Sequence, residues 1–127
     1  RVSADHGIAM IMSYHNFQET PDAATLDGKF AGAQAQGADI GKVAVMPKDP
    51  ADVLALLAAT WRASQALTIP LISMSMGGVG SLSRMIGWVY GSAATFAVGK
   101  SSSAPGQVAI DELRAVLATT RSAVLGR

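Results

Sequence analysis

A lysine stands inside an otherwise apolar segment of this sequence. Lys42 lies between Ile40 and Met46, and its other neighbours in that segment are glycine, alanine and valine. Removing an ammonium group from water costs on the order of several kcal/mol unless it is paired or loses its proton. A lysine that loses its proton is a nucleophile that forms a Schiff base with a ketone. The alternative is an edge-strand lysine that points to solvent, and the pattern leaves both open.

Two further residues have side chains suited to acid–base chemistry or to anion binding. His15 follows an apolar segment, and reactive groups of α/β folds lie at the carboxyl ends of strands. It is a candidate general acid–base, or else a packing or capping histidine. Arg84 lies among Leu82, Met85 and Ile86. It could hold a carboxylate with two parallel hydrogen bonds, or it could be an ordinary surface charge.

The sequence offers little for a metal ion. Its two histidines are nine residues apart, it has no cysteine, and no carboxylate lies within an apolar segment. We therefore expect no metal and no other cofactor. Met74 and Met76 flank Ser75 at a spacing of two, so they share one face of a strand, where a core role is expected.

Four apolar segments predict the strands of a parallel sheet. They begin 32, 31 and 23 residues apart, close to the roughly 30 residues of a strand–helix unit. Their near-continuous hydrophobicity is typical of strands buried on both faces. We expect residues 77–91 to form a long loop with a short helix around 82–86. The four predicted strands are Ile8–Ser13, Ile40–Met46, Leu71–Met76 and Ala94–Val98.

This α/β order fits two architectures within a single domain over residues 1–127. One is a small doubly wound sheet, and the other is half of a (β/α)8 barrel. The glycines at 77, 78 and 80 lack the spacing of a dinucleotide-binding fingerprint, which counts against the first. The pattern of elements alone does not decide between the two.

Composition narrows the classes of partner. The formal net charge is +1 with ten basic residues spread along the chain, so we expect no nucleic-acid surface. No apolar run approaches the roughly 20 residues of a membrane span. The absence of cysteine, and a first segment unlike a signal peptide, favour the cytoplasm. Hydrophobic residues make up 50% and charged residues 15%, which suggests that a partner covers much of the surface.

Taken together, these segments resemble the type I 3-dehydroquinate dehydratases. Five motifs of that family occur in the family's order between residues 13 and 107. The chain departs from the family pattern at Asn16, at Gly77-Gly78 and at Trp88, and none of these departures removes a catalytic group. The motifs are Ser13–Phe17 with Thr20-Pro21, residues 37–47, residues 72–76 with Ser83-Arg84, residues 91–96 and residues 103–107.

The resemblance implies a lyase that converts 3-dehydroquinate to 3-dehydroshikimate in the shikimate pathway. Lys42 would form the imine with the C3 ketone, and His15 would move the protons. Arg84 would bind the substrate carboxylate, with Ser103 and Gln107 on a loop that closes over it. Residues expected to line the pocket are Phe17, Met74, Met76, Phe96 and Ala104.

The resemblance also implies a (β/α)8 barrel of which this chain supplies only part. Family members are about twice as long, and this chain aligns with strands five to eight, the C-terminal half of their barrel. The carboxylate that orients the catalytic histidine would come from the other half. The chain is then a fragment of a longer enzyme, a half-barrel that associates with itself or with a separate N-terminal half, or a non-catalytic remnant that keeps a ligand pocket. A class I aldolase shares a strand lysine but does not account for the other motifs.

Overall fold

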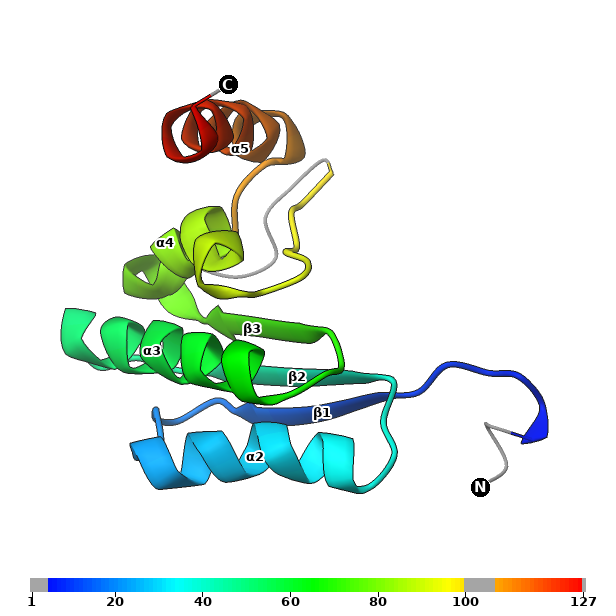
Figure 1. Ribbon diagram of the computed structural model, residues 1–127. Helices are drawn as coiled ribbons and strands as arrows, with labels where there is room; N and C mark the ends of the chain where they lie inside the picture. Colours follow the sequence, from blue (N-terminus) through cyan, green and yellow to red (C-terminus); the bar gives the residue numbers. More distant parts are fainter. Residues whose placement is uncertain (1–4, 100–106, 127) are drawn as a thin grey trace.

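The computed structural model describes residues 5–99 and 107–126. Strands and helices alternate along the chain, and Figure 1 shows them stacked from α2 at one end to α5 at the other. The elements are β1 (Ile11–Asn16), α2 (Ala23–Ala35), β2 (Ile40–Val45), α3 (Pro50–Ala66), β3 (Leu71–Ser75), α4 (Gly77–Ile86), the 3-10 helix η1 (Gly87–Tyr90) and α5 (Ile110–Leu125).

The three strands form one parallel sheet in the order β1-β2-β3. Residues paired across neighbouring strands point to the same face, and successive residues of one strand point to opposite faces. Ser13 pairs with Lys42, which pairs with Ile72. His15 pairs with Ala44, which pairs with Met74. We call the face that these six residues share the His15–Lys42 face.

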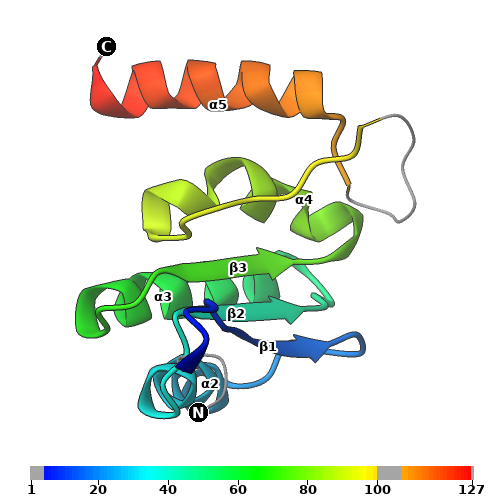
Figure 2. The same cartoon turned by 90° about the vertical axis from the view of Figure 1, so that its right-hand side faces the viewer.

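Helices α2 and α3 cover the opposite face of the sheet, and in Figure 2 the coils of α3 lie behind β2 and β3. Val43 and Val45 project from β2 toward these helices and are almost fully buried. They meet Leu26 and Phe30 of α2, and Leu56 of α3, in one hydrophobic cluster. Burying such side chains contributes about 1.5–3 kcal/mol each, so this cluster holds the helices on the sheet.

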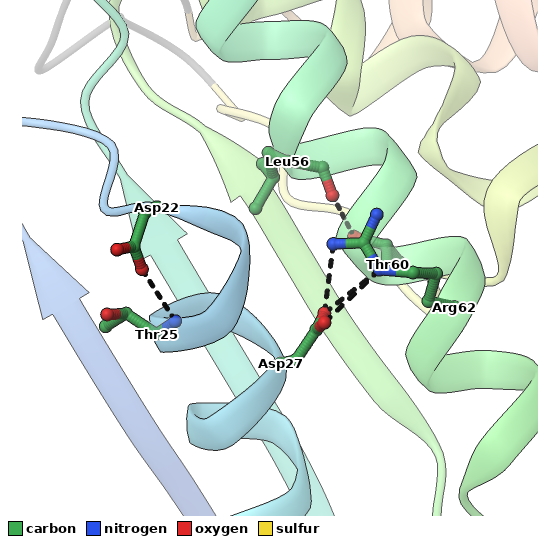
Figure 3. A network of polar contacts seen from close by, with 6 residues as sticks. All are labelled: Asp22, Thr25, Asp27, Leu56, Thr60 and Arg62. Atoms are coloured by element: carbon green, nitrogen blue, oxygen red, sulfur yellow. Dashed lines mark hydrogen bonds and ion pairs between the residues drawn. The ribbon is translucent and has the colours of Figure 1, made fainter.

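Short polar contacts position the same two helices. Asp22 precedes α2, and its carboxylate accepts a hydrogen bond from the Thr25 amide at 2.8 Å. Asp49 has the same capping role for α3, which begins with Pro50 as the sequence predicts for a first helical residue. Arg62 of α3 donates to the carboxylate of Asp27 on α2 at 3.0 Å. Figure 3 shows this exposed ion pair bridging the two helices.

The first and last predicted strands differ from the structure. Strand β1 begins at Ile11 and not at Ile8, and just before it the Met10 amide donates to the Asp39 carboxylate. Because β1 extends to Asn16, His15 lies inside the strand and not beyond its end. The strand predicted over Ala94–Val98 is wrong: within the described residues that segment has only an isolated bridge, from Val98 to Ala109.

Hydroxyl groups explain why this fourth segment does not extend the sheet. The Ser73 amide donates to Ser92 Oγ at 3.1 Å, where a ladder would offer it a backbone carbonyl. One backbone bond, from the Ala93 amide to the Leu71 carbonyl, still ties the segment to β3.

The short helix predicted around residues 82–86 is confirmed as part of α4, but the long loop predicted around it is wrong, since residues 77–90 form α4 and η1. Oγ of Ser83 on α4 accepts a hydrogen bond from the Ser75 amide at 2.8 Å, and this bond holds the helix against the end of β3. Gly80 allows the close approach, because a Cβ there would lie 2.2 Å from the Ser75 carbonyl oxygen. In the part of the chain that the structure describes, no helix is both long and apolar enough to cross a membrane.

Candidate active site

Lys42 lies on the central strand of the sheet. Because β2 has a neighbour on each side, the alternative of a lysine on an edge strand is wrong. The side chain is half-buried, and its Nζ lies 4.7 Å from the centroid of the Phe96 ring. A cation over an aromatic face is attracted by the ring quadrupole. The structure thus gives Lys42 an aromatic neighbour from a segment more than fifty residues away.

His15 lies on the same face as Lys42, on the neighbouring strand. It pairs with Ala44, which is two residues beyond Lys42 toward the carboxyl end of β2. Its ring contacts Phe17 edge-to-face, with centroids 5.8 Å apart and planes at 79°. The imidazole is exposed, so it can exchange protons with a ligand above the sheet.

Four of the residues predicted to line a pocket also meet on or beside the His15–Lys42 face. Met74 is buried there with Ala44 and Ile72, and Met76 packs against them. Phe17 and Phe96 are 67% and 45% exposed and stand next to His15 and Lys42 respectively. The face therefore combines an amine, an imidazole, thioethers and two aromatic rings. Such a combination suits a small ligand with a carbonyl group and an apolar body.

Arg84 lies on α4, beyond the end of β3. It is 7% exposed and lines a cavity of about 440 Å³ whose walls come from α4, η1, residues 92–95 and α5. Thr95 lines this cavity, and the next residue, Phe96, lies against Lys42. Burial lowers the pKa of the Arg84 guanidinium below its ordinary value.

Sequence reasoning missed two neighbours of Arg84 in this cavity, Trp88 and Arg121. Arg121 follows Leu117 by four residues and precedes Leu125 by four, which is one stripe of a helix. That spacing could have placed these three residues on a common wall. Of the remaining expected ligands, Gln107 is half-buried, and Ser103 and Ala104 lie outside the described residues.

A parallel sheet with helices on one face, and an amine and an imidazole from adjacent strands on the other, defines an α/β protein with a candidate active site on its sheet. Residues 1–123 match the family model for Type I 3-dehydroquinase. The chain is 61% identical to the 3-dehydroquinate dehydratase of Albidiferax ferrireducens over 117 residues, which are 92% of this chain and 44% of that protein. It belongs to the type I 3-dehydroquinase family.

Solved structures agree with this assignment. The 3-dehydroquinate dehydratase of Geobacillus kaustophilus superposes with a TM-score of 0.93 at 50% identity, over 96% of this chain and 48% of that one. The type I enzyme from Clostridium difficile, solved with covalently modified comenic acid, gives 0.90 at 39% identity, over 95% and 48%. The chain spans about half the length of the relatives it matches.

Proposed function

We propose that this chain supplies the Schiff-base lysine and the proton-transfer histidine of a lyase that dehydrates 3-dehydroquinate. The observation that carries the proposal is the common placement of Lys42 and His15 on one face of adjacent strands. Membership of the type I 3-dehydroquinase family supports it. The covalent ligand in the related Clostridium difficile structure is consistent with chemistry through a covalent intermediate.

The proposed reaction begins when the neutral Lys42 amine adds to the C3 ketone and water leaves, which forms an imine. The imine withdraws electrons from C2, so loss of the C2 proton to His15 yields a neutral enamine instead of an enolate. The enamine expels the C1 hydroxyl, and the proton held by His15 leaves with it as water. Hydrolysis of the imine then releases 3-dehydroshikimate and restores the amine.

The same proposal assigns the remaining residues. Met74, Met76, Phe17, Phe96 and Ala104 would line the pocket, and Ser103 and Gln107 would bind the substrate. Arg84 binds the substrate carboxylate. We also place the reaction in the cytoplasm, with no cofactor.

Borohydride trapping tests the Schiff base. The chain is incubated with 3-dehydroquinate and sodium borohydride, digested and analysed by mass spectrometry. We expect the mass of the reduced adduct on Lys42 and on no other lysine, and its loss in Lys42→Met. Lys48 serves as a control because it lies in the same protein next to a helix start. If a full-length relative treated in the same way is labelled while Lys42 of this chain is not, the assignment is refuted for this chain.

We further propose that β1, β2 and β3, together with the segment that follows η1, occupy the places of strands five to eight of a (β/α)8 barrel. We also propose that a second polypeptide segment covers the His15–Lys42 face in the working protein. Several large apolar side chains on or near this face and the β1 edge support this. Ile8 is 60% exposed, Ile11 52% and Phe17 67%. Apolar groups gathered in this way mark an interface.

A second candidate function follows from that exposure, a self-associating half-barrel without lyase activity. Light scattering distinguishes the cases. A dimer that is not labelled by borohydride and 3-dehydroquinate favours the non-catalytic half-barrel, and a labelled dimer favours an enzyme assembled from two copies. A stable monomer refutes self-association.

A further inference from the structure

The turn that follows β1 is shaped by the side chain of Asn16. Its Oδ1 accepts hydrogen bonds from the backbone amides of Gln18 and Glu19, each at 3.0 Å. An asparagine that accepts from amides further along the chain bends the backbone in a defined way. Strand β1 ends at Asn16, so pairing with β2 does not determine the path of the residues beyond it. The Asn16 side chain therefore guides the backbone where the strand stops.

The Asn16 side chain is itself held from the helix side of the sheet. Tyr14 and Asn16 pair with Val43 and Val45, so they point toward the helices, away from the His15–Lys42 face. Nδ2 of Asn16 donates to the Tyr14 hydroxyl at 3.2 Å. Tyr14 is partly buried and packs against the hydrophobic cluster of α2, α3 and β2. The Asn16 amide is thus oriented by a residue of the core, with its oxygen toward the turn.

The far end of this turn is bound to the strand that carries Lys42. The Met46 amide, just beyond the end of β2, donates to the Glu19 carbonyl at 3.3 Å. Oγ1 of Thr20 donates to the Met46 carbonyl at 2.9 Å. The turn is therefore attached to β1 at its start and to β2 at its end, and Phe17 lies between the two attachments.

Phe17 is the residue through which this turn reaches His15. The two rings meet edge-to-face, with centroids 5.8 Å apart and planes at 79°, which is a favourable arrangement of aromatic rings. Both side chains are exposed, so core packing does not hold either ring in place. The position of the imidazole consequently depends on the backbone path that carries Phe17.

We propose that Asn16 is a positioning residue for His15. By holding the turn after β1, Asn16 places the Phe17 ring against the imidazole and so fixes the direction in which His15 meets a ligand above the sheet. Asn16 acts through Phe17 because its own side chain is on the opposite face. The value of this placement for catalysis rests on the proposed role of His15 in proton transfer. The placement itself can be measured without substrate, so its failure is distinct from failure of the dehydratase proposal.

The test is nuclear Overhauser spectroscopy of the isotopically labelled chain without substrate, at about pH 9, where an ordinary imidazole is uncharged. In the parent chain we expect cross-peaks between the ring protons of His15 and Phe17. We also expect the Gln18 and Glu19 amides to exchange slowly with solvent. His6, which precedes β1, is the internal control and should show no cross-peak with Phe17.

Four variants separate the turn from the side chains around it. Asn16→Ala removes the acceptor, so the His15–Phe17 cross-peak should weaken about threefold or more and the two amides should exchange about three- to tenfold faster. Asn16→Gln, whose oxygen is one methylene further out, should behave in the same way. Asn16→Asp keeps an acceptor oxygen in place and should restore both signals. Gln18→Ala keeps the amide that donates to Asn16 and should match the parent chain.

The proposal is overturned if the His15–Phe17 cross-peak keeps its full strength in Asn16→Ala, since the ring contact would then not depend on the turn. It is also overturned if Asn16→Asp fails to restore the cross-peak, or if Gln18→Ala loses it as well. Cross-peaks within the hydrophobic cluster of α2, α3 and β2 report whether each variant keeps its fold. If Asn16→Ala unfolds, Asn16→Gln decides the question with the same two signals.

Discussion

The Nζ atom of Lys42 lies 4.7 Å from the centroid of the Phe96 ring, although the two residues belong to different segments of the chain. At a partly exposed site, such a contact stabilises a cation by about 0.5–1 kcal/mol. The ring therefore positions the Lys42 side chain and covers one side of its amine.

Replacing the ring should make Lys42 more reactive. In Phe96→Leu the cation–π contact is lost while an apolar side chain remains. We expect the rate of acetylation of Lys42 by acetic anhydride, measured by mass spectrometry, to rise about two- to fivefold. Lys29, which lies 4.6 Å from the Tyr14 ring, should react at its original rate and is the matched control. An unchanged rate at Lys42 would show that the ring contact has no influence on the amine.

The contact of α4 with the end of β3 depends on Gly80. A Cβ at this position would lie 2.2 Å from the Ser75 carbonyl oxygen and 2.4 Å from its carbonyl carbon, which are backbone atoms that cannot move cheaply. Gly80→Ala should lower the free energy of unfolding by about 2 kcal/mol or more in urea denaturation. Gly78→Ala is the control, because nothing lies within 4 Å of its Cβ, and it should be neutral or slightly stabilising.

A buried hydroxyl pair connects α3 to β3. Oγ1 of Thr60 donates a hydrogen bond to the Leu56 carbonyl at 2.8 Å. It also lies 2.7 Å from Oγ of Ser73, and either hydroxyl can be the donor in this second bond. Thr60→Val should cost about 1–3 kcal/mol, because it leaves the Ser73 hydroxyl buried without this partner. Figure 3 shows the position of Thr60 against Leu56.

The double variant Thr60→Val with Ser73→Ala should cost less than the sum of the two single variants, as measured by urea denaturation. Thr120→Val, a half-buried threonine of α5 that bonds only within its own helix, should change stability by less than about 0.5 kcal/mol. Strict additivity in the cycle would mean that the two hydroxyls do not interact.

The cap of α2 should make stability depend on pH. Hydrogen bonds from the side chain and the backbone amide of Thr25 lower the pKa of Asp22 below its ordinary value. The stabilising contribution is therefore complete above the unfolded-state pKa of about 3.9, and it is lost as pH falls through the lower folded-state pKa. Asp22→Ala should be less stable than the parent chain near neutral pH, and the difference should shrink in strong acid. Thermal unfolding at a series of pH values measures it, and a difference independent of pH would contradict the role of the carboxylate.

Much of the fold could be predicted from local pattern. Apolar runs over Ile40–Met46 and Leu71–Met76 predict strands buried on both faces, and the structure has strands at Ile40–Val45 and Leu71–Ser75. Aspartate followed by proline at 49 and 50 marks the start of α3, because the side chain caps the amides and proline needs no donor. These signals depend only on neighbouring residues, so they can be recognised in a single sequence.

The errors have a common cause. The segment Ala94–Val98 has the composition of a strand, but the Ser73 amide bonds to Ser92 Oγ, and a composition cannot show which acceptor an amide will find. Glycines at 77, 78 and 80 favour a loop before the helix predicted around 82–86, whereas the structure begins α4 at Gly77. Gly80 lets this first turn pack against Ser75 at the end of β3, a contact that exists only in three dimensions.

The sequence by itself determined that Lys42 is an unusual lysine, that β/α units alternate, and that the motifs are those of one family. Only the tertiary structure decided that Lys42 is on a central strand, that His15 is on the same face, and that Arg84 is buried on α4. The physical reason is register. Which residues share a face, and which arginine loses its water, depends on pairing between strands and helices that are distant in sequence.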